Sequence, residues 1–395
     1  MAKREPRIER IEMAERDNVV QLVGMDKLTK DLKDTAGTMG RVEAGYLVSM
    51  YYTIQTDRQR MSSQLMELQK RGEPHKLVQF SRDQFIAQEE AIKLALDVWT
   101  RNTIMGQWSR QIIGIGPVLA AGLDAWVNLE NCRTAGDLWS FSGLNPMAKW
   151  LGAAKSKQVV AAIKMKHDVK KFSNLPEDGR RAFLGECAKE MGLVNNPHPR
   201  GEHGTVDGAG RLIQRMGKDK WTEAALVKAM SKRPWNAELK TLCWKIGESF
   251  KNFSGREDSL YGKLYLQRKA YEWEKNLNGD YSDQAVAKAE IVAKTTKAHL
   301  WNTGRFSSEH VRTAMVNGVL LSSLDPDGDG TARSHGTLML SPGHIMERSK
   351  RWATKLFLAH YHHVGWVRVL NKEPVNPYPM EHLGHAHVIG PERAA

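Results

Sequence analysis

Two glycines and a proline between two apolar segments form the stretch of this sequence best suited to binding a phosphate group. The stretch reads Gly114-Ile115-Gly116-Pro117-Val118. Glycine tolerates a positive φ and leaves the backbone unobstructed, and proline suits the first position of a helix because its missing N–H costs nothing there. We therefore expect a tight turn that presents bare backbone amides at the positive end of a helix dipole, a favourable environment for phosphate.

The apolar segments on either side give this turn the order of a helix-hairpin-helix. The first segment ends near Arg110, and the second continues through Val118-Leu119-Ala120-Ala121. A helix-hairpin-helix holds the DNA backbone without reading bases, and this interpretation predicts contacts from Gly114, Ile115, Gly116 and Val118. The alternative is an ordinary corner between two core helices, because short glycine motifs carry a high false-positive risk.

The charge balance favours a polyanionic partner. The 395 residues include 58 Lys and Arg against 45 Asp and Glu, a net charge of +13. Such a surplus is typical of nucleic-acid binding, but it does not separate DNA from RNA or from an anionic membrane surface. The longest near-apolar run, Ile112–Leu123, is too short to span a bilayer, and the charged N-terminus has no apolar signal segment. The three scattered cysteines favour a reducing compartment, so we expect a cytoplasmic protein that does not bind membranes.

Helical periodicity dominates the chain, and we expect a mostly α fold without convincing strands. Leu47, Ile54, Met61 and Leu68 are spaced seven residues apart, which predicts a long amphipathic helix or a coiled coil. Ser81 is the predicted N-cap of a second helix. Residues 41–101 are therefore expected to form either a helical hairpin within one chain or a dimerising arm, and we expect a homo-oligomer formed through them.

Changes in composition divide the chain into six segments. A charged arm spans 1–40, the helical hairpin or coiled coil 41–101, and the hairpin motif with a basic segment 102–172. A loop-rich inserted subdomain spans 173–232, a helical domain 233–372, and a Pro- and His-rich tail 373–395. Ser341 and Pro342 begin the last helix of the helical domain, and its inner face is predicted from residues in helical rhythm: Ile345, Trp352, Leu356, His360, His363 and Val367.

Basic residues downstream of the hairpin motif are candidates for additional phosphate contacts. They are Lys149, Lys155, Lys157, Arg233 and Lys240. A charge run is more often a solvated face, and both interpretations stay open here. Four tryptophans could stack on bases: Trp139, Trp150, Trp235 and Trp244. Core packing is the expectation for Trp139 and Trp244, which lie within apolar periodicity.

Potential metal ligands form no strong motif. The segment Asp325–Gly330 imitates the start of a calcium loop, but position 12 falls on Gly336. His382, His385 and His387 fit no strong zinc spacing, and His360 and His363 are expected to be packed or hydrogen-bonded. Three carboxylates flank the hairpin and could hold Mg²⁺: Asp124, Glu130 and Asp137. Helix capping explains Asp124 and Asp137 adequately, so we expect no firm cofactor, with Mg²⁺ only if the chain is an enzyme.

The region from Gly114 to Pro146 resembles one known module. The glycine hairpin is followed by an alanine-rich helix and by Arg133-Thr134-Ala135-Gly136-Asp137-Leu138-Trp139-Ser140-Phe141-Ser142-Gly143-Leu144-Asn145-Pro146. This order resembles the C-terminal domain of insertion-sequence transposases described as bridge-RNA-guided recombinases. Looser matches at Arg233–Lys240, Tyr261–Tyr265 and Arg348–Leu370 extend the resemblance over 83–370, with 153–231 and 280–342 as additions.

The resemblance implies a DNA-binding protein of a mobile element or virus, and it alone implies RNA as a further partner. Two departures remove the expected chemistry. The family's N-terminal nuclease-like domain is not matched by the charged arm, and its nucleophilic serine in a Ser-Gly pair is replaced in Met147–Gly152. Ser156 lacks the following glycine. The alternatives are an active recombinase or nuclease with an atypical metal-dependent site, and a self-assembling structural protein.

Overall fold

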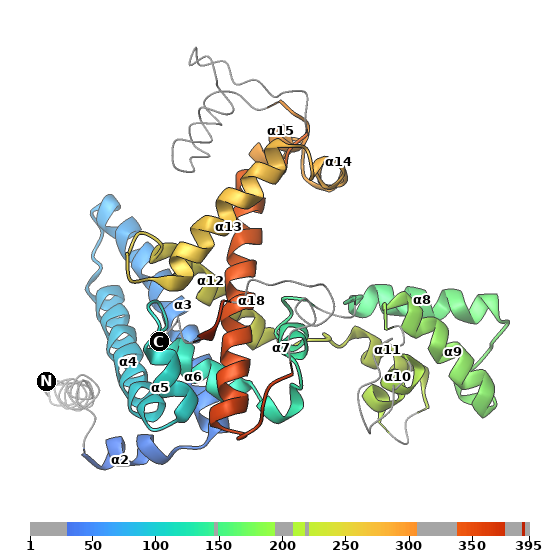
Figure 1. Cartoon of the computed structure of the whole chain (residues 1–395), viewed down its shortest axis with the longest axis horizontal. Coiled ribbons are helices and arrows are strands. Elements are labelled where there is room, and N and C mark those ends of the chain that lie inside the picture. Colours follow the sequence, from blue (N-terminus) through green and yellow to red (C-terminus); the bar gives the residue numbers. More distant parts are fainter. Residues whose placement is uncertain are drawn as a thin grey trace, which may run out of the picture. The chain divides into compact units, whose positions relative to one another are not determined.

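The computed structural model describes residues 30–145, 149–193, 208–217, 221–305, 338–375 and 389–391. These ranges hold fifteen α-helices and two 3₁₀-helices and no strand, which confirms the mostly α fold (Figure 1). The chain divides into two compact units. Unit 1 comprises residues 1–135 and 242–395, and unit 2 comprises residues 136–241. No helix in the described ranges combines the length and apolarity needed to cross a membrane.

An antiparallel helical hairpin opens unit 1. Helix α3 (Arg41–Arg71) ends at Gly72, whose φ of 68° lets the chain leave the helix, and α4 (Lys76–Arg101) packs back along it. The intrachain alternative predicted for 41–101 is therefore present, and self-association through it stays a prediction. The predicted N-cap at Ser81 is wrong because α4 begins at Lys76, and the Ser81 hydroxyl donates to the Leu77 carbonyl one turn back. Helix α2 (Lys30–Thr38) precedes the hairpin, within the predicted charged arm.

Two short helices, α5 (Ile104–Arg110) and α6 (Pro117–Trp126), carry the glycine turn between them. Helix α6 packs against both α3 and α4. Its residue Val118 is buried in one apolar cluster with Val48 of α3 and Leu96 of α4. The 3₁₀-helix η2 (Leu129–Asn131) follows. The long hairpin thus fixes the position of the α6 N-terminus.

Aromatic side chains form the centre of unit 1. Helix α12 (Ala237–Asn252) contributes Phe250, which stacks on Tyr261 of α13 (Leu260–Leu277) with ring centroids 4.8 Å apart. Phe357 of α18 (Pro342–Arg368) stacks on Trp108 of α5 at 6.0 Å. These contacts hold α5, α12, α13 and α18 together and so place both ends of the glycine turn.

Helix α18 begins as predicted, with the Ser341 hydroxyl accepting from the His344 amide. Its predicted inner face is only partly right. Ile345 and His360 are buried, but His363 and Val367 are exposed, and Phe357, Tyr361 and Val364 are buried instead. The buried face is rotated because α18 packs against α13 and α5, which periodicity within a single helix does not identify.

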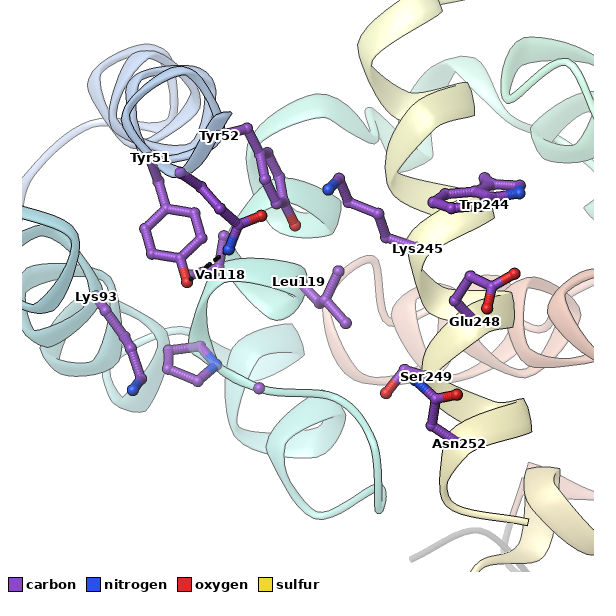
Figure 2. A pocket seen from close by; sticks show the side chains of 13 residues that line it. Tyr51, Tyr52, Lys93, Val118, Leu119, Trp244, Lys245, Glu248, Ser249 and Asn252 are labelled. Carbon is purple, nitrogen blue, oxygen red and sulfur yellow. Dashed lines mark hydrogen bonds between the residues drawn. The ribbon is translucent and has the colours of Figure 1, made fainter. Parts of the chain in front are cut away.

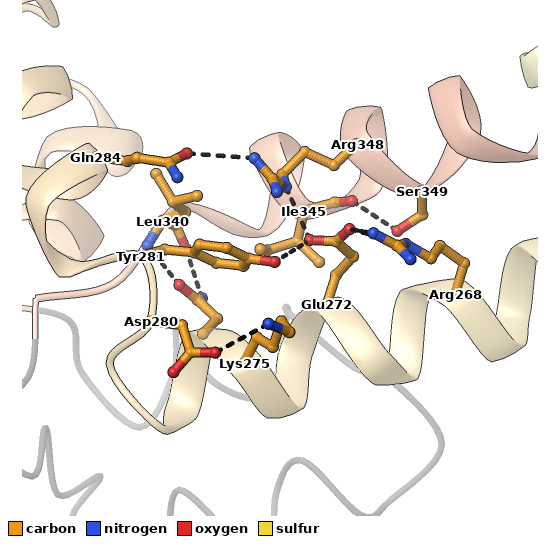
Figure 3. Close-up of polar contacts among 11 residues, drawn as sticks. Arg268, Glu272, Lys275, Asp280, Tyr281, Gln284, Leu340, Ile345, Arg348 and Ser349 are labelled. Carbon is orange, nitrogen blue, oxygen red and sulfur yellow. Dashed lines mark hydrogen bonds and ion pairs between the residues drawn. The ribbon is translucent and has the colours of Figure 1, made fainter. Parts of the chain in front are cut away.

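A buried carboxylate connects α13 with α18 (Figure 3). Glu272 is 1% exposed and accepts hydrogen bonds from Tyr281 Oη at 2.6 Å, Arg268 Nη2 at 2.6 Å and Arg348 Nε at 2.8 Å. Burial alone would raise the pKa of Glu272, but these three donors outweigh it and hold the pKa below its ordinary value. Beyond α13 the chain forms two further helices, α14 (Ser282–Ile291) and α15 (Lys297–Asn302).

Unit 2 has a separate apolar core. Its helices are α7 (Ala135–Phe141), α8 (Gly152–Lys166), α9 (Glu177–Glu190), α10 (Gly208–Met216) and α11 (Glu223–Ser231), with the 3₁₀-helix η3 (Phe172–Asn174). Val160 and Ile163 of α8 share this core with Leu184 and Leu226. One apolar core therefore contains residues from both sides of the boundary expected at 172/173. The basic segment and the expected insertion pack together.

Candidate phosphate-binding cleft

The turn between α5 and α6 requires a glycine at position 114. Gly114 has a φ of 97°, which L-residues rarely adopt, and a Cβ there would lie 2.9 Å from Ser249 Oγ. The Ser249 hydroxyl donates a 2.6 Å hydrogen bond to the Gly114 carbonyl and so ties the turn to α12. Gly116 differs, since its backbone is extended (φ −80°, ψ 176°) and no heavy atom lies within 4 Å of a Cβ placed there.

Two backbone amides at the start of α6 have no acceptor among the described residues. Pro117 occupies the first helical position as predicted, and Gly116 has no side chain to cap the helix. The first helical hydrogen bond runs from the Ala120 amide to the Gly116 carbonyl, so the Val118 and Leu119 N–H groups remain unpaired. The predicted contact at Ile115 has another role, because its amide donates to Ile112 and its side chain is buried.

The residues that carry these amides, Val118 and Leu119, line a cleft of about 440 Å³. Four helices line it, and Figure 2 shows the side chains from α3, α6 and α12 around the opening. The lining residues are Tyr51, Tyr52, Gln55, Lys93, Gly116, Pro117, Val118, Leu119, Trp244, Lys245, Glu248, Ser249 and Asn252. Two of the predicted contact residues, Gly116 and Val118, thus lie at a cleft that also contains two lysines.

Lys245 gives the cleft a cation without an anionic partner in the described part of the chain. Its side chain extends from α12 toward α3, where Nζ lies 4.0 Å from the ring centroid of Tyr52 (Figure 2). Burial lowers the pKa of Lys245 from its ordinary value, because the ammonium group is partly removed from water. A phosphate bound in the cleft would relieve that electrostatic cost.

The acidic groups around the cleft are already paired. The Glu248 carboxylate binds Lys251 at 2.5 Å and also binds Lys350, whose side chain is 3% exposed. Lys93 binds Glu90 at 3.2 Å on the exposed side of α4. The lysines therefore outnumber the carboxylates around the opening, which favours an anion there.

Sequence reasoning missed both cleft lysines and misplaced one tryptophan. Lys93 and Lys245 belong to helices far from the glycine turn in sequence, and only the packing of α4 and α12 against α6 brings them to it. Trp244, expected in the core, is 53% exposed because it lies on the side of α12 opposite Leu242 and Ile246. Its ring lies 5.3 Å from Lys350 Nζ.

The five predicted basic contacts all belong to unit 2. Lys149, Lys155 and Lys157 are exposed, the last two on α8. Arg233 and Lys240 are also exposed, and each stands over a tryptophan ring. Of these five residues, only Arg233 and Lys240 contact other side chains that the sequence analysis singled out, namely Trp150 and Trp235.

Among the candidate ligands, Asp124 is not a helix cap. It lies in the last turn of α6, and its Oδ2 atom is buried with no hydrogen-bond partner among the described residues. Burial raises the pKa of Asp124. Asp137 lies in the first turn of α7, where a carboxylate favours the helix, and Glu130 is exposed. In the part of the chain that the structure describes, no three potential ligands gather around a metal position.

Of the two α18 histidines expected to be packed or hydrogen-bonded, His360 is buried and hydrogen-bonded, whereas His363 is exposed. His360 Nδ1 lies 2.6 Å from Tyr261 Oη, and His360 Nε2 lies 2.6 Å from the Ile389 carbonyl oxygen. The calcium-like segment Asp325–Gly330 and the histidines His382, His385 and His387 lie outside the described residues.

Comparison of the chain with protein-family models, with curated proteins and with solved structures finds no match. The chemistry of the cleft is therefore inferred from its own geometry.

Proposed function

We propose that this chain binds DNA through the sugar–phosphate backbone, with one phosphate seated at the N-terminus of α6. The observation that carries the proposal is the meeting of two different features in one cleft. The Val118 and Leu119 amides offer two unpaired donors at the positive end of a helix, and Lys245 offers an unpaired ammonium group.

This combination suits a phosphate diester better than a neutral ligand. Backbone amides and a lysine recognise phosphate oxygens and carry no information about base sequence. Binding through them is expected to be largely independent of sequence and strongly dependent on salt. The logarithm of the affinity should fall with the logarithm of the salt concentration, with a slope of about −0.9 for each phosphate neutralised.

The resemblance to the transposase module supports the same function and adds further proposals. It favours a protein of a mobile element or virus that acts in the cytoplasm, with RNA as a second partner. The exposed residues Lys149, Lys155 and Lys157 of unit 2 would add charge for nucleic acid. Self-association through 41–101 is part of the same proposal.

A binding panel at low salt tests the proposal. Fluorescence anisotropy of labelled duplex, fork, junction, single strand and structured RNA should show duplex binding that weakens as salt is added. Lys245→Gln should weaken duplex binding about tenfold or more, since charge-assisted contacts contribute roughly 1.5–3 kcal/mol. Lys70→Gln is the matched control, because it removes the same charge from an exposed position at the far end of α3.

Two results would count against the proposal. Absence of binding to every nucleic acid in the panel at low salt would refute it outright. An equal loss of duplex affinity in Lys245→Gln and Lys70→Gln would show that the overall positive charge of the protein, and not the cleft, holds the DNA. Nicking of supercoiled DNA in the presence of Mg²⁺ would instead favour the recombinase or nuclease alternative.

A further inference from the structure

Aromatic and basic side chains also gather within unit 2, on residues that flank its helices. Two of the aromatic residues are well exposed, Trp150 at 47% and Phe141 at 38%. Trp235 lies beside Trp150, with ring centroids 6.4 Å apart and an interplanar angle of 74°. Arg233 and Lys240 complete the group, which we refer to as the tryptophan cluster.

Each tryptophan of the cluster carries a cation. The Arg233 guanidinium lies 4.8 Å from the Trp150 ring centroid, and Lys240 Nζ lies 4.1 Å from that of Trp235. Both cationic residues are exposed. The cluster thus combines a flat aromatic surface with positive charge. Sites that bind single-stranded nucleic acid use the first to stack a base and the second to attract a phosphate.

The rings are held in fixed positions. Trp150 Nε1 donates a 2.8 Å hydrogen bond to the Ser231 carbonyl. The Asn236 amide donates to the Phe141 carbonyl at 2.9 Å, so the turn after α7 lies against the start of α12. A Cβ on Gly143 in that turn would lie 2.8 Å from Trp235 Cγ and 2.9 Å from Lys240 Cδ. A side chain so constrained loses little further entropy when a ligand stacks on it.

We propose that the tryptophan cluster binds an unpaired nucleotide, with its base stacked on Trp150 and a neighbouring phosphate beside Arg233 or Lys240. Bases inside a duplex are already stacked on each other, whereas unpaired bases offer both faces to an aromatic ring. The ligand is therefore single-stranded nucleic acid, either DNA or RNA. This site lies within unit 2 and does not depend on the α6 cleft of unit 1.

The test measures binding of labelled oligothymidylate and oligouridylate to the full chain by fluorescence anisotropy. Trp150→Leu should weaken binding of at least one of the two about tenfold, within the range found when one stacking ring is removed. Trp150→Phe is the matched variant, since it keeps a ring and loses only the hydrogen bond to Ser231. It should retain affinity within about threefold, which separates stacking from a merely structural role.

Two further variants keep the test decisive. If thermal denaturation shows that Trp150→Leu unfolds, the exposed pair Arg233→Gln and Lys240→Gln replaces it and should weaken oligonucleotide binding about fivefold or more. Gly116→Asp, which places a carboxylate at the α6 cleft, should leave oligonucleotide binding unchanged even where it weakens duplex binding more than a hundredfold. Preference for one oligonucleotide identifies the strand as DNA or RNA. Absence of binding to both, or wild-type affinity in a folded Trp150→Leu protein, overturns the proposal.

Discussion

Replacing Gly116 with aspartate should weaken DNA binding more than a hundredfold while leaving the fold intact. Gly116 is the N-cap of α6, with the extended backbone that capping residues adopt and with open space around a new Cβ. The aspartate carboxylate would accept from the Leu119 amide, the donor that we assign to the phosphate. Since aspartate caps a helix slightly better than glycine, thermal stability should stay the same or rise by a few tenths of a kcal/mol.

The expected loss of affinity has two causes, which are electrostatic repulsion of the phosphate and loss of the amide donors. A carboxylate about 4 Å from a phosphate would be repelled by about 4 kcal/mol at the effective dielectric constant of a protein surface, before salt screening lowers this value. The amide donors taken by the carboxylate account for roughly a further 1.5 kcal/mol. Allowing for screening, we expect a net loss of about 3 kcal/mol, which is more than a hundredfold in affinity.

Gly116→Asn is the matched control, because asparagine has the same shape and caps equally well without the negative charge. It should cost about 1.4 kcal/mol, or tenfold, through the occupied amide alone. Both variants and the wild type should be titrated with a labelled duplex at low salt, with melting temperatures recorded in parallel. A folded Gly116→Asp protein that binds DNA as tightly as the wild type would refute the assignment of the phosphate to α6.

Three other substitutions test separate parts of the structure. Lys245→Gln should reduce the slope of log affinity against log salt by about 0.9, as measured by anisotropy titrations over a series of salt concentrations. Gly114→Ala should lower the melting temperature, since a left-handed conformation costs roughly 1–2 kcal/mol outside glycine and the new methyl group meets Ser249. Glu272 has a lowered pKa, so the stability it contributes is present above its unfolded pKa of roughly 4.3 and is lost as the pH falls through the lower folded value. Glu272→Gln should therefore be less stable than the wild type near neutral pH, with the difference shrinking in acid, as chemical denaturation at several pH values would show.

The local signals in the sequence account for much of the fold. The seven-residue spacing from Leu47 to Leu68 predicts α3, Ser341 followed by Pro342 predicts the start of α18, and Pro117 predicts the start of α6. Each of these signals lies within a single helix or at its first turn, so the information is contained in one continuous segment of the sequence. The positive φ at Gly114 is also a local feature, because the tight turn around this glycine requires it.

The cleft itself required tertiary information. Tyr52, Lys93 and Lys245 are far apart in the chain and belong to three helices, and no spacing in the sequence relates them. The buried face of α18 was misjudged for the same reason, since its partner helices decide which side is covered. Trp244 lies within an apolar rhythm and yet is exposed, because its neighbours Leu242 and Ile246 occupy the buried side of α12.

The most direct test of the α6 cleft follows the backbone amides themselves. The measurement is the change in the ¹⁵N–¹H chemical shifts of Val118 and Leu119 when a short DNA duplex is added at low salt. Both N–H groups lack an acceptor among the described residues, so a phosphate that binds there must become their hydrogen-bond partner. We predict that these two amide protons move downfield more than those of the other residues in unit 1. Unchanged Val118 and Leu119 resonances in a protein saturated with DNA would contradict the proposed binding site.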